Sequence, residues 1–311
     1  MPEDPPEAVS FETEFRGTDA ATYAMPGRAG LRVPLDLLGG DTSETLFRSA
    51  ISGGEEHGFR LFSARGLSFG CAVQPVDGRL EASTLDLYGR LLRATGGLSI
   101  YRVWNYLPDI NQVSLGLEQY QAFSSGRARA FEAAFGPEYR RNLPAASAVG
   151  CRGGSIALAF VAGAQSPQYF ENPEQIPAYD YPQKYGPHSP SFARATVAVQ
   201  EGRPLIYLSG TSAVKGHDTV FPGSVGAQIE CTLDNLRLIS RAAGAGEDLG
   251  AALGYERQFK VYLRHRTDFP MAKARLDTGL FRRGDRVVWL QADLCRADLT
   301  IEVEASLAGR P

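Results

Sequence analysis

Two glutamates close to the end of the chain have the spacing best suited to chemistry. They lie in LCRADLTIEVEASL, whose residues 299–307 are typical of a strand. Successive side chains on a strand point to opposite faces, so Glu302 and Glu304 share one face while Ile301 and Val303 share the other. Two interpretations stay open. Both glutamates face solvent, or Glu302 faces an apolar cleft that raises its pKa and makes it a general acid.

Three arginines are candidates for binding an anion: Arg127 in FSSGRARAF, Arg194 in SPSFARA and Arg275 in AKARLD. The planar guanidinium suits a carboxylate because it donates two parallel hydrogen bonds. Gly126 and Gly154 could let backbone N–H groups approach a ligand, although glycines also mark ordinary turns. An arginine considered alone is more often a surface residue.

Cys295 stands just before the final strand, seven residues from Glu302. A lone cysteine is usually a small inert hydrophobic residue, and this one becomes a candidate through its neighbourhood. The four cysteines and four histidines are scattered without zinc-site spacing, and the motifs GxGxxG, GxSxG and the Walker loop are absent. We therefore expect ordinary acid–base side chains acting on a small molecule, without a metal.

Composition and net charge limit the classes of partner that the protein can bind. The chain has 311 residues, 43% of them hydrophobic and 22% charged, with a formal net charge of -3. Without a basic bias we expect no nucleic-acid partner, and without an apolar run of about 18 residues we expect no membrane span. The N-terminus, MPEDPPEAVSFETEF, lacks the basic and apolar regions of a signal peptide, so a cytoplasmic location is expected.

Apolar periodicity predicts the same order of elements in each half of the chain. The first half contains a hairpin, a helix, a strand, a second helix and a strand, at residues 59–73, 84–95, 98–107, 117–135 and 155–162. The second half contains a hairpin, a helix, a strand, a short helix and two strands, at residues 195–209, 227–243, 259–265, 268–277, 287–292 and 299–307.

This repeat predicts an α+β fold of two similar domains, each a mixed β-sheet with helices packed on one face. We expect the domains to span residues 1–165 and 166–311, the second carrying the acid. A plain linker between them would be rich in Gly, Ser or charge. The joining stretch, residues 164–191, instead contains five tyrosines and phenylalanines, which favours an ordered loop that forms part of the site.

Four segments together make the sequence resemble the chorismatases, enzymes of secondary metabolism that release pyruvate from chorismate. They are YRVWNYLPDIN, ENPEQIPAYDYPQKYGPHSPSFARA, YLSGTSAVKGH and LQADLCRADLTIEVEA. The C-terminal half separately resembles the small RidA-type fold, whose last strand carries a similar E-x-E-A run. The resemblance implies two RidA-like, or chorismate-mutase-like, domains with the active site between them, and neither metal nor organic cofactor.

The resemblance also implies roles for single residues. It makes Glu302 the catalytic acid, and Arg275 and Arg127 the clamps on the substrate carboxylates. It places Tyr185 and Tyr179 in the pocket lining.

Asn105 is expected near the pocket from the same resemblance. Gly154 stays the candidate for substrate binding through its backbone, from its place before a strand and not from the resemblance. The residues at positions 210 and 295 distinguish the branches of the family. The hydrolytic branch tends to have alanine and no cysteine at these positions, and the 3-hydroxybenzoate branch has glycine and cysteine.

This chain reads Gly210 and Cys295, which favours cleavage of chorismate to 3-hydroxybenzoate and pyruvate. Several alternatives stay open: the hydrolytic branch, which gives a dihydroxycyclohexadiene carboxylate, and a third branch that makes both 3- and 4-hydroxybenzoate. Two others are a RidA-like imine or enamine deaminase and a binder of small anions without catalysis. The sequence leaves the oligomeric state open.

Overall fold

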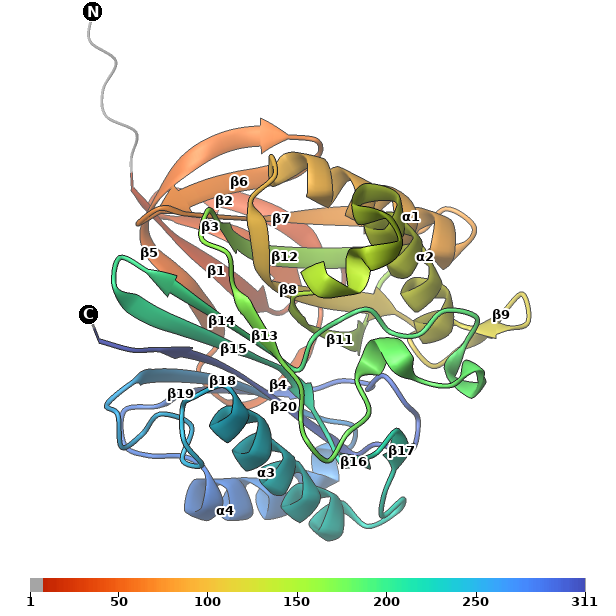
Figure 1. Cartoon of the computed structure of the whole chain (residues 1–311), viewed down its shortest axis with the longest axis vertical. Coiled ribbons are helices and arrows are strands. Elements are labelled where there is room, and N and C mark those ends of the chain that lie inside the picture. Colours follow the sequence, from red (N-terminus) through yellow and green to blue (C-terminus); the bar gives the residue numbers. More distant parts are fainter. Residues whose placement is uncertain (1–7, 311) are drawn as a thin grey trace, which may run out of the picture.

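A computed structural model describes residues 8–310 as two β-sheets stacked face to face, with helices on both outer faces. The four layers are visible in Figure 1, where α1 (Leu80–Ala94) and α2 (Gln119–Phe135) cover the upper sheet. The lower sheet is covered by α3 (Val225–Ala242) and α4 (Phe269–Gly279). We call the space between the two sheets the inter-sheet seam.

The first sheet has nine strands. In chain order they are β1 (Val9–Phe15), β2 (Ala21–Met25), β3 (Arg28–Val33), β5 (Ser43–Glu56), β6 (Phe59–Ala64), β7 (Leu67–Pro75), β8 (Ser99–Pro108), β11 (Ala145–Cys151) and β12 (Ser155–Gly163). Their spatial order is β11-β8-β12-β7-β6-β5-β1-β3-β2.

The second sheet has seven strands. They are β4 (Asp36–Gly40), β13 (Gln168–Phe170), β14 (Ala195–Gln200), β15 (Arg203–Thr211), β18 (Glu256–Leu263), β19 (Arg286–Gln291) and β20 (Ile301–Ala308). Their spatial order is β13-β14-β15-β20-β18-β19-β4. Two small hairpins lie outside these sheets: β9 (Val113–Ser114) with β10 (Leu117–Glu118), and β16 (Val214–Lys215) with β17 (Asp218–Thr219).

The two sheets contain the same unit. Strands β6-β7-β12-β8-β11 of the first sheet follow the same order as β14-β15-β20-β18-β19 of the second. In each unit the last pair, β8 with β11 and β18 with β19, is parallel, and the other pairs are antiparallel. The α+β class and the predicted repeat of elements are therefore confirmed.

The strands before residue 57 are the part of the fold that periodicity did not predict. Four of them extend the first sheet beyond β6, and β4 instead joins the far edge of the second sheet. Apart from β4, the strands up to Gly163 belong to the first sheet and those from Gln168 onward to the second. We therefore keep residue 165 as the proposed domain boundary.

Alternation along β20 directs its two sets of side chains to different layers. Ile301, Val303 and Ala305 pack in the apolar layer under α3 and α4. Glu302 and Glu304 face the seam, where both are buried. The alternative in which these glutamates face solvent is wrong, because the first sheet covers the face of β20 that carries them.

Glu304 lies in a buried cluster of charges that ties the two sheets together. It accepts hydrogen bonds from Arg102 and Trp104 of the first sheet and from Lys260 of the second, each at 2.8 Å. Lys260 also bonds Glu44. Burial alone raises the pKa of Glu304, but Lys260 and Arg102 outweigh it and hold the pKa below its usual value. A fixed negative charge therefore stands two residues from Glu302.

No helix in the part of the chain that the structure describes is long and apolar enough to cross a membrane. Between residues 8 and 310, the His, Cys, Asp and Glu side chains also form no group of three or more that could hold a metal ion.

Candidate active site

A pocket at one end of the seam gathers several of the predicted site residues. Glu302, Cys295, Gly210 and Tyr185 all line it, as does Arg194. The stretch that joins the two halves also contributes lining residues, namely Gln175, Tyr181, Tyr185 and Pro190. The stretch therefore lines this pocket, and the prediction that it forms part of a site stays a prediction.

Glu302 is the acid of this pocket. Its side chain stands opposite Tyr262 in the β18–β20 pairing, and the residue is only 3% exposed. Its Oε1 atom has no hydrogen-bond partner. Burial, and then the negative charge of Glu304, raise the pKa of Glu302 to about 8, although Arg102 and Arg194 act in the opposite direction. At neutral pH most of this carboxyl group is protonated.

Gly210 provides the room that the Glu302 side chain occupies. A Cβ atom at position 210 would lie 2.6 Å from the carboxyl carbon of Glu302, closer than the 3.0 Å that real Cβ atoms keep. The pairing of β15 with β20 shifts register between Leu208 and Thr211, beside this point. Such irregularities change the direction in which nearby side chains point, and this one lies where Gly210 contacts Glu302.

Cys295 contributes a neutral thiol. Burial, followed by the charge of Glu302, raises the pKa of Cys295 to about 12. The thiolate is the nucleophilic form of cysteine, and a thiol with this pKa is protonated at neutral pH. We therefore expect Cys295 to shape the pocket beside Glu302 rather than to attack a substrate as a thiolate.

Two guanidinium groups line the pocket. Arg194 is 7% exposed, donates a hydrogen bond to the Tyr181 hydroxyl at 2.6 Å, and has an Nε atom without a partner. Arg296 lies over the Tyr185 ring at 4.2 Å and over the Tyr181 ring at 5.3 Å. Sequence reasoning missed Arg296, although it directly follows Cys295 in one of the segments that carry the family resemblance.

Arg127 lies directly behind the pocket wall. Its guanidinium is 5.8 Å from the ring of Phe192, a lining residue, and 4.8 Å from Phe123. The residue is buried, and its Nε and Nη2 atoms have no hydrogen-bond partner. An unpaired buried cation is costly, so Arg127 adds positive potential to this side of the pocket.

The structure corrects the prediction for Arg275. This side chain is 41% exposed and bonds the Gly226 carbonyl and the Glu230 carboxylate on α3. Helix α4 buries Ala272 and Leu276, so Arg275 faces away from the sheet. Because α4 lies on the outer side of the second sheet, Arg275 cannot act as a clamp in the seam.

Three other predicted residues also lie outside the pocket. Asn105 faces α1, where it accepts a hydrogen bond from Tyr88 and donates one to the Ser147 carbonyl. Tyr179 packs against the apolar layer under α1 and α2. Gly154 lies exposed between β11 and β12, with nothing within 4 Å of a Cβ built on it. Asn105 is the one of the three with a link to the site, since its partner Tyr88 lies beside Arg127.

If the active site were chosen by cavity volume alone, a different cavity would be the candidate. The pocket around Glu302 encloses about 70 Å³, whereas a second cavity in the seam encloses about 480 Å³. Ligand pockets usually enclose about 300–1,000 Å³. We select the smaller pocket because it holds the buried acid beside two cations. A ring-sized ligand requires its aromatic lining to open, and Tyr181 and Tyr185 come from the irregular joining stretch.

Comparisons with known proteins agree with this selection. A 3-hydroxybenzoate synthase of Streptomyces hygroscopicus is 36% identical over 265 residues, which are 80% of this chain and 77% of the relative. A chorismatase of Streptomyces rapamycinicus is 36% identical over 253 residues, 77% of this chain and 74% of the relative. A crystal structure of a chorismatase matches 99% of this chain and 95% of its own with a TM-score of 0.82 at 28% identity.

Residues 46–162 also match the family described as chorismatase FkbO/Hyg5-like, N-terminal. This match covers the first repeat, and the curated relatives extend the similarity to more than three quarters of the chain. The chain therefore belongs to the chorismatase family, as the resemblance of its sequence segments predicted.

Proposed function

We propose that this protein cleaves chorismate to 3-hydroxybenzoate and pyruvate. The observation that carries the proposal is the buried carboxyl of Glu302, in a pocket that also holds Arg194 and Arg296. Its Oε1 atom has no hydrogen-bond partner among residues 8–310, and burial raises its pKa to about 8. Chorismate is a dianion with an enolpyruvyl ether, so it needs two cationic contacts and one proton donor. The pocket provides all three.

Arg194 and Arg296 are the proposed clamps for the two carboxylates, in place of Arg275. The Nε of Arg194 makes no hydrogen bond to residues 8–310 and lies 4.0 Å from the Glu171 carboxylate, and Tyr181 holds the guanidinium group. Arg296 is held over the Tyr181 and Tyr185 rings. Arg127, behind Phe192, strengthens the positive potential. Holding the dianion in a fixed orientation beside the acid supplies much of the rate, because fixed charges need no reorganisation during the reaction.

Protonated Glu302 then donates its proton to the methylene carbon of the enolpyruvyl group, which gives an oxocarbenium ion. The neighbouring ring hydroxyl displaces the enolpyruvyl oxygen within the molecule, releasing pyruvate and a proton. The ring then rearranges to the aromatic product without adding or losing other atoms. The released proton replaces the one that Glu302 gave, so the reaction consumes no water.

The experiment that tests the proposal is incubation of the purified protein with chorismate, followed by chromatography of the products. We expect equal amounts of 3-hydroxybenzoate and pyruvate. If the dihydroxycyclohexadiene carboxylate is the ring product and no hydroxybenzoate forms, the protein belongs to the hydrolytic branch. A mixture of 3- and 4-hydroxybenzoate would indicate the third branch, and ammonia from 2-aminoacrylate without chorismate turnover would indicate a deaminase.

Replacing Gly210 by alanine is expected to change the products. The added Cβ overlaps the carboxyl group of Glu302, so the acid must move and leave room for a water molecule beside the substrate. We expect a lower kcat and a larger share of the hydrolytic product, measured as the product ratio by chromatography.

A matched control is Gly89→Ala, where a Cβ on helix α1 meets only the flexible end of Arg93 at 3.7 Å. The Gly89 variant should keep the wild-type product ratio. If Gly210→Ala left both kcat and the product ratio unchanged, Gly210 would not set the position of the acid.

Alanine variants of Arg296 and Arg275 test which of the two arginines binds a substrate carboxylate. Arg296→Ala is expected to raise KM for chorismate by about 10- to 100-fold, since a hydrogen bond to a charged group contributes about 1.5–3 kcal/mol. Arg275→Ala should stay within about twofold of wild type, the scale of an exposed ion pair. Steady-state kinetics on both variants decide the assignment, and the reverse order of effects would restore Arg275 as the clamp.

A further inference from the structure

The larger cavity of the inter-sheet seam lies at the opposite end from the acid. Glu302 is near the start of β20, whereas Ser306, Leu307 and Ala308 at the end of that strand line this cavity. Five residues of strand separate Glu302 from Leu307, about 17 Å at 3.3–3.4 Å per residue. The cavity encloses about 480 Å³, which is within the usual range for small-molecule sites.

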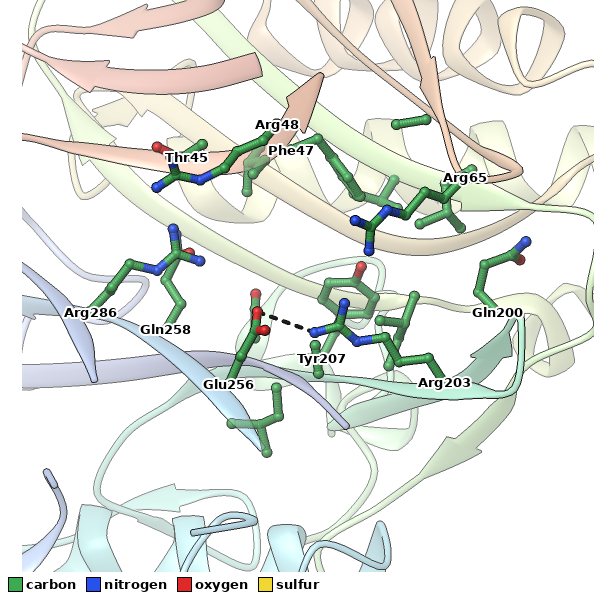
Figure 2. Close-up of a pocket in the computed structure, with 18 of the residues that line it drawn as sticks. Thr45, Phe47, Arg48, Arg65, Gln200, Arg203, Tyr207, Glu256, Gln258 and Arg286 are labelled. Atoms are coloured by element: carbon green, nitrogen blue, oxygen red, sulfur yellow. Dashed lines mark ion pairs between the residues drawn. The ribbon is translucent and has the colours of Figure 1, made fainter. Parts of the chain in front are cut away.

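The rim of the cavity is rich in arginine. Four arginines line it, against two glutamates, in a chain whose formal net charge is -3. Figure 2 shows Arg48 and Arg286 on one side of the opening and Arg65 and Arg203 on the other.

One of these guanidinium groups is already neutralised. Arg203 pairs with Glu256 at 3.1 Å, the contact drawn as a dashed line in Figure 2. Arg48, Arg65 and Arg286 form no ion pair or side-chain hydrogen bond with any residue from 8 to 310. Three guanidinium forks around one opening therefore remain available for an anion.

The floor of the cavity is apolar and aromatic. Trp104 and Tyr207 meet there edge to face with ring centroids 6.4 Å apart, and Phe47 stacks on Phe69 at 4.0 Å. Trp104 is 1% exposed, its indole N–H is bonded to Glu304, and Arg102 and Lys260 lie over its ring. It therefore supports the floor from behind, and the half-buried Phe47 and the edge of Tyr207 are the rings that a ligand meets. Such a floor suits a flat hydrophobic ring.

We propose that this cavity is a second binding site, for a small aromatic carboxylate whose ring lies on Phe47 and Tyr207. The carboxylate then bonds the guanidinium group of Arg286, and the buried amide of Gln258 lies beside Arg286 in Figure 2. Arg65, on the other side of the opening, adds positive charge to the site. The cavity lacks a sheltered acid, because Glu256 is 73% exposed and paired with Arg203. It is therefore a site for binding and not for cleavage, and the inference does not rest on the proposed reaction.

The test is calorimetric titration with 3-hydroxybenzoate as the probe, on wild type, on Arg65→Ala/Arg286→Ala and on Arg93→Ala/Arg266→Ala. The last pair removes the same charge from exposed positions outside both cavities. We expect two binding events in wild type and in the control variant, one of them in the catalytic pocket. The cavity variant should lose one event, or weaken it at least tenfold.

A second readout is the intrinsic fluorescence of Trp104, measured with Trp289, the other tryptophan, replaced by phenylalanine in all three proteins. The probe should quench this fluorescence without the cavity substitutions and with the control pair, but not in the cavity variant. Indistinguishable titrations of the cavity variant and the control would overturn the proposal. Chorismate turnover is measured separately on all three proteins. Its absence throughout would refute the proposed reaction, whatever the binding result.

Discussion

Glu302→Gln is expected to lower kcat for chorismate by about 10²- to 10⁴-fold, the range that a positioned general acid contributes. Glutamine keeps the shape of the side chain but has no proton acidic enough to transfer to carbon. Because Glu302 is neutral at pH 7 in the wild type, the substitution leaves the buried charge balance intact and the fold should survive. Steady-state kinetics with circular dichroism as a folding check measures both effects.

Glu230→Gln is a suitable control, because Glu230 is an exposed carboxylate on the outer surface. It should leave kcat within about twofold of wild type, as surface changes usually do. A Glu302→Gln variant with more than a tenth of wild-type kcat would contradict the assignment of Glu302 as the acid.

The same carboxyl group predicts how wild type depends on pH. Activity should fall as pH rises through about 8, because the donor loses its proton there. The folded-state pKa is above the ordinary glutamate value of about 4.5, so between these two pH values the folded protein retains a proton that the unfolded chain releases. Stability from this group is complete below about pH 4.5 and is lost as pH rises through 8. Glu302→Gln should therefore gain stability relative to wild type as pH rises from about 4.5 to about 8, with no further gain at higher pH.

Arg194→Met is expected to lower kcat/KM by about 30- to 4,000-fold, because truncating one partner of a buried charged contact costs about 2–5 kcal/mol. The variant retains the length of the side chain and loses the fork that contacts the substrate. Arg194 also opposes the rise in the Glu302 pKa, so its removal should move the falling limb of the pH profile to higher pH.

Two further variants separate the functions of Arg194. Tyr181→Phe removes only its hydrogen-bond partner and should have a smaller effect. Arg194→Lys keeps the charge without the fork and should recover part of the activity. A pH profile that stays in place in Arg194→Met, together with kcat/KM within threefold of wild type, would place Arg194 outside the reaction.

The periodic part of the fold could be predicted from the sequence, and so could the acid. Alternation along β20 separates Glu302 from the apolar residues on either side, whatever the strand pairs with. The repeated element order was also readable, since each helix and strand carries its own pattern. The strands before residue 57 were not, because their register depends on partners far along the chain, such as β4 against β19.

The clamps could not be predicted, because a position along the chain does not say which layer a side chain faces. Arg275 and Arg296 are both plausible in sequence, but packing of Ala272 and Leu276 turns Arg275 outward. The cluster around Glu304 is a stronger example. Arg102, Lys260 and Glu44 come from three strands far apart, and charged residues in strands usually indicate solvent until a second sheet covers them.

The central claim is that Glu302 holds a proton at neutral pH beside two guanidinium groups. The most direct measurement is an NMR pH titration of protein labelled with carbon-13 at the glutamate carboxyl carbons, with the Glu302 signal assigned by its absence in Glu302→Gln. We predict a midpoint near pH 8. A midpoint below about 5, where ordinary glutamates titrate, would contradict the account.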